Sequence, residues 1–411
     1  MNKSFPYNGI ISLLCGLTIS TLDGIIYSWS VFMLPVEEAT GWYRTQTSLV
    51  FTAILAFFSL GMICGGLICK KIGTRATAAT GCLLFAAGFY IASAARQIWL
   101  FIIAYGMIAG FGIGISYIVA ISTGVAWFPK HRGLVCGILA FGLSFGTLIL
   151  GSWLGNMFIA GMGIFPTFKI LAAFVLLAGC MASFFIKNPT NISSNKTNKT
   201  IAVVSSHDYT TINMLGTCSF RFIWYWAFTI QVGGLMIIGH LVPFAMNMNL
   251  TAALAAIAVG TYAIANGFGR LLFGYLYDLK GFRLAMLCNS IFMITGLMFL
   301  LLLSKNANAI SFFTGVILVA LACGGSMPQF CAFIAQNYGS KYLENNMGMS
   351  ATAVMIAGFA GPFVSGWIYN TWESYKIAIL GAIIIALSGI LLVLLTKSEN
   401  MEQSKTKLKP V

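Results

Sequence analysis

Two ionisable residues stand inside long apolar stretches of this sequence, Asp23 and Arg270. A charged side chain at the centre of a membrane-spanning helix costs about 2.5–3.5 kcal/mol, so such residues are functional candidates by default. The guanidinium of Arg270 can hold a carboxylate through two parallel hydrogen bonds. Asp23, in a partly dry site, can take up a proton. The two residues predict an anion site and a proton site.

Polar and aromatic residues accompany both charges. Asn266 and Tyr262 precede Arg270 by four and eight positions, so we expect them on the same helix face. Tyr27 follows Asp23 by one turn. Two structural alternatives stay open. Arg270 can serve only to pair with Asp23 or with backbone carbonyls, and Asp23 can be a static partner of a later helix.

A third titratable residue, His240, lies in the stretch Gly239-His-Leu-Val-Pro243. Histidine titrates near neutral pH, so a role in a proton relay is one interpretation. We expect His240 near the outer end of its helix, where a solvated or hydrogen-bonded histidine is the alternative interpretation.

The composition is that of a membrane protein. Apolar residues make up 59% of 411 positions and charged residues 8%, where a soluble domain has roughly a quarter. The net charge of +14 is expected in loops, so no nucleic-acid partner is predicted. The ten cysteines form no CxxC or Cys/His cluster, and no catalytic set appears. We therefore expect no metal, no cofactor and no enzymatic activity.

The apolar residues fall into twelve blocks, each long enough for a helix that crosses a bilayer. This predicts an all-α membrane protein with two six-helix bundles, residues 1–186 and 220–396, a cytoplasmic linker at 187–219 and a tail at 397–411. The first block lacks a cleavage site and is interpreted as a span. The predicted spans are 8–34, 46–69, 76–95, 98–126, 134–158, 164–186, 220–247, 252–277, 284–304, 309–336, 348–370 and 374–396.

Lysine and arginine predict the orientation. With a cytoplasmic N-terminus, 17 of them fall on the cytoplasmic side and 5 on the opposite side. Basic residues concentrate in cytoplasmic loops, so both termini are predicted to be cytoplasmic. The sequons at Asn191, Asn195 and Asn198 then lie on the wrong side for glycosylation. We expect a multi-pass monomer in a cell membrane, the inner membrane in a bacterium.

Two loops repeat a pattern at a constant offset of 208 residues. A second match, at an offset of 215, links Gly133 and Gly146 to Gly348 and Gly361. Internal repeats are typical of secondary transporters. We expect the loop glycines to allow close helix approach, and the arginines to pair with an acidic residue or a helix end. The repeated positions are Gly66, Gly73 and Arg75 in the first loop, and Gly274, Gly281 and Arg283 in the second.

The second loop, with Asp278 between its glycines, resembles the G-x-x-x-D-x-x-G-x-R pattern of the major facilitator superfamily. The first loop departs from the pattern, because Lys70 stands where the acidic residue belongs. The resemblance covers the whole chain and implies the two-bundle fold, with both loops near the cytoplasmic gate.

Further stretches resemble the oxalate–formate antiporter family and the related monocarboxylate transporters. The resemblance implies an anion carrier in which Arg270 contacts the substrate carboxylate, with Tyr27 and Tyr117 in the same site. Val354 stands where the oxalate carriers have a second cation, a lysine. The stretches are Gly24–Phe32, Tyr117, Trp127–Gly133, Gly239–Pro243, Asn266–Arg270 and Asn337–Ser340.

These observations predict a secondary active transporter of a small organic anion that works by alternating access. With one cationic anchor, a monocarboxylate such as lactate, pyruvate or formate is favoured. Proton coupling stays open, as do symport and exchange. The alternatives are an oxalate/formate-type exchanger and an exporter of amphipathic compounds. A sensor is disfavoured, since no soluble signalling domain is attached.

Overall fold

The structure is a computed structural model that describes residues 7–128, 132–189, 209–302, 308–338, 346 and 348–395. These residues form helices and no strand. The three sequons and the tail at 397–411 lie outside the described residues. The helices are α1 Tyr7–Asp23, η1 Gly24–Ser28, α2 Trp29–Thr40, α3 Arg44–Ile72, α4 Thr74–Ala94, α5 Ile98–Phe101, η2 Ile102–Ala109, α6 Gly110–Trp127, α7 Arg132–Gly146, η3 Thr147–Gly155, α8 Asn156–Met162, α9 Ile164–Phe185, α10 Thr211–Leu215, α11 Cys218–Asn247, α12 Ala252–Leu301, α13 Ala309–Tyr338, α15 Ser350–Gly358, η4 Phe359–Phe363, α16 Val364–Trp372 and α17 Lys376–Leu395.

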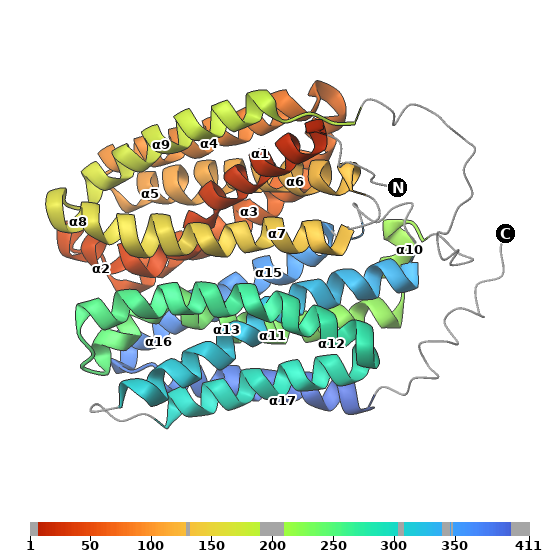
Figure 1. Ribbon diagram of the computed structural model, residues 1–411. Coiled ribbons are helices and arrows are strands. Elements are labelled where there is room, and N and C mark those ends of the chain that lie inside the picture. Colours follow the sequence, from red (N-terminus) through yellow and green to blue (C-terminus); the bar gives the residue numbers. More distant parts are fainter. Residues whose placement is uncertain are drawn as a thin grey trace.

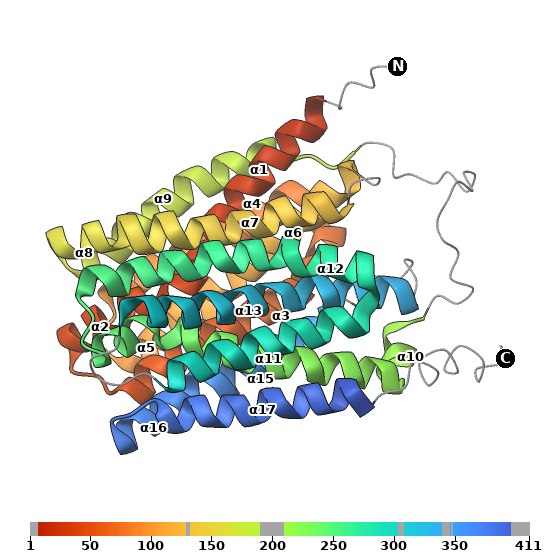
Figure 2. The ribbon, with the colours of Figure 1, turned by 60° about the horizontal axis from the view of Figure 1, so that its bottom comes forward.

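The predicted number of spans is confirmed in these ranges. Eleven helical stretches are long and apolar enough to cross a membrane. One of them, α12, has 50 residues, or about 75 Å of helix rise, which is far more than a bilayer needs. Gly281, with φ 77° and ψ 170°, interrupts it, so α12 is two spans joined by a sharp corner (Figure 2). That makes twelve.

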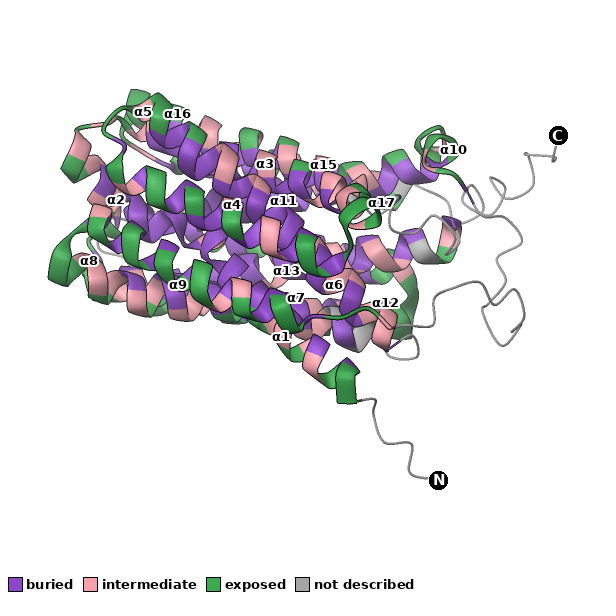
Figure 3. Cartoon of the chain, turned by 90° about the horizontal axis from the view of Figure 1, so that it is seen from above, coloured by how far each residue is buried: buried purple, intermediate pink, exposed green. Residues whose placement is uncertain are grey.

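The spans form two bundles that lie side by side (Figure 1). Helices α1 to α9 make one bundle and α11 to α17 the other, and the start of α1 and the end of α17 lie at the same end of the molecule. Exposed residues lie on the outward faces and buried ones where helices meet (Figure 3). Large apolar side chains are among the exposed ones, as lipid contact requires; they include Leu177, Trp153 and Tyr275.

The repeated loops have matching local structures. Gly73 and Gly281 both have positive φ, 82° and 77°, which glycine adopts without steric cost. Arg75 Nε donates to Ile186 O at 3.1 Å, and Arg283 Nη2 donates to Leu394 O at 3.0 Å. Positions 186 and 394 are again 208 apart. Each arginine therefore caps the carboxyl end of the last helix of its own bundle, and a gating role stays a prediction.

Close helix approach occurs at other glycines than those expected. A Cβ added at Gly66 would meet nothing within 4 Å, and one at Gly274 would make only ordinary contact, so the expectation for these two was wrong. At Gly146 a Cβ would collide with Thr21 O, and at Gly361 it would crowd Val232 O. The offset of 215 thus marks the position at which the fifth membrane span of each bundle packs closely against the first span.

Two local features differ from the predictions. The first span runs to Thr40 and contains a 3-10 turn, η1, in its middle. Within the predicted linker, Thr211–Leu215 forms the short helix α10, which begins because Thr210 accepts a hydrogen bond from Asn213 N at 3.4 Å. Hydropathy reports neither feature, since both depend on local hydrogen bonding.

Candidate functional site

Arg270 lies on α12, eleven residues before the corner at Gly281, which is about 16 Å of helix. Its side chain is half-buried. Nη2 reaches Asn266 Oδ1 at a long 3.4 Å, while the buried Nε has no hydrogen-bond partner. Among the described residues no carboxylate lies within ion-pair distance of this guanidinium. Arg270 is therefore a cation whose hydrogen-bonding capacity is largely unused.

The residues around Arg270 come from both bundles. Tyr27 of η1, Tyr262 of α12 and Cys323 of α13 lie close enough to Arg270 for an ionised side chain there to be affected by the charge of the guanidinium. Tyr117 of α6 lies within the same range of Tyr27. The hydroxyl of Tyr262 donates to Gly234 O at 3.0 Å. The structure thus brings together Arg270, Asn266, Tyr262, Tyr27 and Tyr117, which the sequence singled out.

Asp23 lies apart from this group, inside the first bundle. It is fully buried, and Ser116 Oγ of α6 donates to its Oδ1 at 2.8 Å. Its Oδ2 is buried without a partner. In this conformation, within the described residues, no ion pair joins Asp23 to Arg270, so the pairing that the sequence left open is not formed.

The 3-10 turn explains why Asp23 and Tyr27 separate. In an α-helix, residues four apart lie about 40° apart around the axis, whereas in a 3-10 helix they lie about 120° apart. Residues Gly24–Ser28 wind as a 3-10 helix directly after Asp23. Tyr27 therefore turns toward Arg270 while Asp23 stays with α6.

The second bundle holds a counterpart of the Asp23 pair that sequence reasoning missed. Gln231 of α11 is buried, and its Nε2 donates to Ser326 Oγ of α13 at 3.1 Å. Gln231 follows Asp23 by 208 residues, and Ser326 follows Ser116 by 210. The repeat offset was the signal that would have found it.

His240 is buried rather than solvated at a helix end, with 2% of its surface exposed. Its Nε2 lies 2.8 Å from Pro362 O and 3.3 Å from Ser48 Oγ. Its Nδ1 lies 3.2 Å from the hydroxyl of Tyr375. The histidine therefore joins α3 of the first bundle to η4 and the start of α17 in the second. Of its two interpretations, the hydrogen-bonded one describes this conformation.

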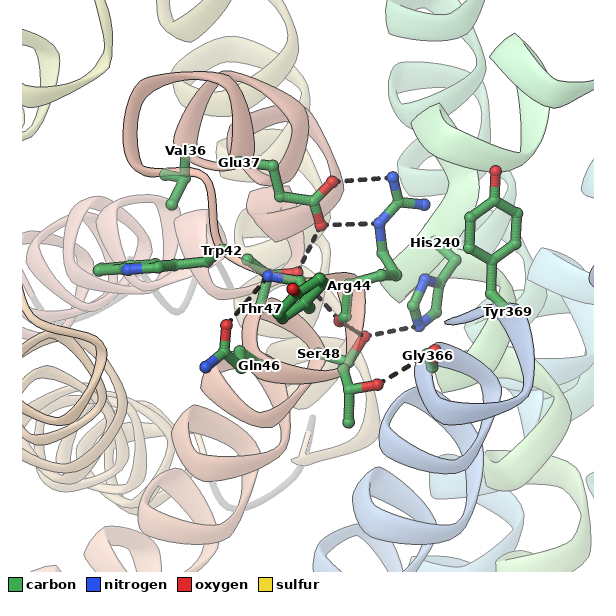
Figure 4. A network of polar contacts seen from close by, with 12 residues as sticks. Val36, Glu37, Trp42, Arg44, Gln46, Thr47, Ser48, His240, Gly366 and Tyr369 are labelled. Atoms are coloured by element: carbon green, nitrogen blue, oxygen red, sulfur yellow. Dashed lines mark hydrogen bonds and ion pairs between the residues drawn. The ribbon is translucent and has the colours of Figure 1, made fainter. Parts of the chain in front are cut away.

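An ion pair that the sequence did not reveal adjoins His240 (Figure 4). Arg44 donates to both oxygens of Glu37, at 2.7 and 2.8 Å, and Thr47 donates to Glu37 at 2.6 Å. Arg44 Nη1 donates to the Tyr375 hydroxyl at 2.7 Å, and the guanidinium lies over the Tyr369 ring, 4.8 Å from its centroid. We call Glu37, Arg44, Ser48, His240 and Tyr375 the distal network. It surrounds the α2–α3 and α16–α17 junctions, which lie at the end of the molecule opposite the start of α1 and the end of α17 (Figure 1).

Comparison with known proteins gives a consistent result. The family model described as Major Facilitator Superfamily matches residues 13–313 and 225–410. The oxalate:formate antiporter of Oxalobacter formigenes is 25% identical over 364 residues, 86% of this chain and 85% of that protein. Monocarboxylate transporter 10 of Danio rerio is 25% identical over 346 residues, 80% of this chain and 65% of that protein.

A solved structure agrees with the fold. A bacterial homologue of the human lysosomal transporter Spinster superposes with a TM-score of 0.70 over 98% of both chains, at 14% identity. The resemblance read from the loops at residues 66–75 and 274–283 is thereby confirmed. The chain belongs to the Major Facilitator Superfamily of membrane transporters.

Proposed function

We propose that this transporter carries a small monocarboxylate, of the lactate, pyruvate or formate type, with Arg270 as its anchor. The observation that carries the proposal is the buried Arg270 Nε without a hydrogen-bond partner. Leaving a charged group buried and unpaired is costly, so an incoming carboxylate gains both the ion pair and the missing hydrogen bond. The printed names of the relatives, an oxalate:formate antiporter and a monocarboxylate transporter, support the substrate class.

The arrangement suits alternating access. Arg270, Asn266 and Tyr262 belong to the second bundle, whereas Tyr27 and Tyr117 belong to the first. A substrate held by Arg270 against the two tyrosines would contact both bundles, so its binding favours their closure around it. We assign Asn266 to hold the guanidinium and the three tyrosines to shape the cavity.

Charge favours a monocarboxylate over a dianion. Val354, at the position of the lysine in the oxalate carriers, is a buried aliphatic side chain. A dianion bound to Arg270 alone would keep one charge uncompensated in a low-dielectric site. A Val354→Lys variant should therefore gain oxalate transport relative to formate.

We further propose that Asp23 binds the coupling proton and that both termini are cytoplasmic, which makes the distal network the outer end. The excess of basic residues at the end that carries the termini supports this orientation. Residues 1–186 and 220–396 are the proposed rocking units, 187–219 the linker and 397–411 the tail. We propose a monomer in a cell membrane.

The test begins with a ligand screen on the purified protein. Binding raises thermal stability by mass action, so lactate, pyruvate or formate should raise the melting temperature.

In proteoliposomes, Arg270→Lys should abolish transport of the same carboxylate, because a lysine cannot make the bidentate contact. Arg96→Lys is the control, since Arg96 is exposed and stacks on Phe165 of its own bundle.

Each alternative gives a different pattern. Undiminished transport by Arg270→Lys, with an intact control, would remove Arg270 from the site. Stabilisation by oxalate above all monocarboxylates would indicate a dianion exchanger. Stabilisation by amphipathic cations alone would indicate an exporter.

A further inference from the structure

The distal network closes one end of the transporter. Five hydrogen bonds between the described residues cross from α3 to the second bundle in this region. Arg44 bonds to Tyr375 at 2.7 Å, Thr45 to Asn370 at 2.7 Å, and Thr52 to Gly358 O at 2.9 Å. The other two are Ser48 with His240 at 3.3 Å and Thr45 with Gly366 O at 3.5 Å. Opening this end requires these bonds to break.

The partners of His240 match a neutral imidazole. Pro362 O can only accept, so Nε2 must carry a hydrogen and donate to it. Tyr375 O accepts from Arg44, which can only donate, and the phenol hydrogen is then available to donate to Nδ1. In this arrangement Nδ1 is the lone-pair nitrogen of a neutral imidazole. Arg44, Tyr375, His240 and Pro362 form one chain in which each donor meets an acceptor.

A second proton on His240 would break this chain. An Nδ1–H group would face the O–H of Tyr375, so two donors would meet. Tyr375 could accept a hydrogen bond from His240 only if its own hydrogen turned away. Two cations, Arg44 and the imidazolium, would then both donate to the Tyr375 oxygen. The cavity beside His240 and Tyr375 measures about 10 Å³, which is the space of roughly one water molecule. The closed end has little room to solvate the added charge.

We propose that His240 is a proton-binding site that controls the outer end of the transporter. This end closes only when the imidazole of His240 is neutral, and the imidazolium holds it open. The proposal rests on the proposed orientation, which exposes this end to the external pH, and not on the identity of the substrate. External acid then favours the outward-open state. The charged and titratable groups that face His240 or adjoin its partners are Arg44 of α3, Glu37 of α2, Tyr369 of α16 and Tyr375 before α17.

Hydrogen–deuterium exchange of the purified full-length protein tests this directly. Peptides covering residues 44–55 and 358–375 report opening of the distal end. His240→Gln is the matched variant, because its amide can donate to Pro362 O and accept from Tyr375 but cannot take up a proton. Comparing the two proteins at the same pH cancels the intrinsic exchange rate. The two should match near pH 7.5, and near pH 5.5 the wild type should exchange at least about threefold faster.

The remaining variants keep the result interpretable. His240→Arg, whose guanidinium stays charged throughout, should exchange fast at every pH, and Glu37→Gln should raise exchange without removing the pH difference. If His240→Gln does not fold, Tyr375→Phe replaces it and should exchange fast with little pH dependence. Peptides from α4 report that the fold is intact. Equal exchange of wild type and His240→Gln at all pH values would overturn the proposal, whatever the outcome for Arg270.

Discussion

The two bundles each bury one polar pair between their first and fourth helices, and the pairs differ in one respect. In the second bundle, Gln231 donates to Ser326, and Ser326 donates to Cys323 O at 2.8 Å, three residues earlier. In the first bundle, Ser116 Oγ lies within hydrogen-bond distance of three acceptors. They are Asp23 Oδ1 at 2.8 Å, Ile113 O at 3.0 Å, again three residues earlier, and Gly112 O at 3.1 Å. The geometry repeats, but an amide has been exchanged for a carboxyl group.

This exchange shows where a proton can change the structure. A hydroxyl has one hydrogen, so Ser116 cannot serve both Asp23 and the backbone carbonyls of its own helix at once. When Asp23 is protonated, it can donate to Ser116, which then donates to Ile113 O, and the first bundle adopts the pattern of the second. When Asp23 is ionised, Ser116 must turn to it, and Oδ2 stays without a partner. Gln231 holds the neutral pattern permanently.

The largest effect on transport should come from removing the carboxyl group that distinguishes the first bundle from the second. Asp23→Asn makes the first bundle resemble the second, and we expect proton-driven accumulation to fall at least about tenfold while exchange stays within about threefold of wild type. Labelled carboxylate uptake into proteoliposomes, with and without an inward proton gradient, measures both. Glu38→Gln, at an exposed carboxylate, is the control. Full gradient-driven accumulation by Asp23→Asn would show that the proton binds elsewhere.

A smaller effect should follow from the reverse exchange, Gln231→Glu. Gln231 Oε1 accepts from Cys323 at 3.5 Å, and Cys323 interacts with Arg270, so a carboxylate here would compete with the substrate. We expect uptake to fall about three- to tenfold near pH 7.5 and to recover near pH 5.5, where the new carboxyl group is protonated. The apparent KM at both pH values is the measurement. A KM that matches wild type at pH 7.5 as well as at pH 5.5 would place Gln231 outside the reach of the substrate site.

The pattern of the sequence was sufficient for the fold but not for these contacts. Hydropathy placed the spans, and the spacing of Gly73, Arg75, Gly281 and Arg283 predicted two equivalent loops, because both signals are local. Neither fixes how a helix is rotated about its axis. The 3-10 turn at Gly24–Ser28 sets that rotation and separates Asp23 from Tyr27.

The candidate site was predicted only in part for the same reason. Arg270 and its tyrosines stood out by residue type within apolar blocks. The distal network did not, because Arg44 and Tyr375 are 331 positions apart and meet only when the bundles close. Under the offset of 208, Glu37 and Arg44 correspond to Ala245 and Ala252, so the repeat gave no guide to that network either.

The smallest effects should come from the loops in which the bundles agree. Arg75 and Arg283 are exposed, and each donates to the last carbonyls of a helix, an interaction of about 0.3–1 kcal/mol. Arg75→Gln and Arg283→Gln should each lower the melting temperature by about 1–2 °C, and the double variant by the sum, since the caps lie in separate bundles. Differential scanning fluorimetry measures this. If the melting temperature of the double variant falls by clearly more than the sum, the two loops contact each other. The two halves would then share a gate at the end that carries the termini.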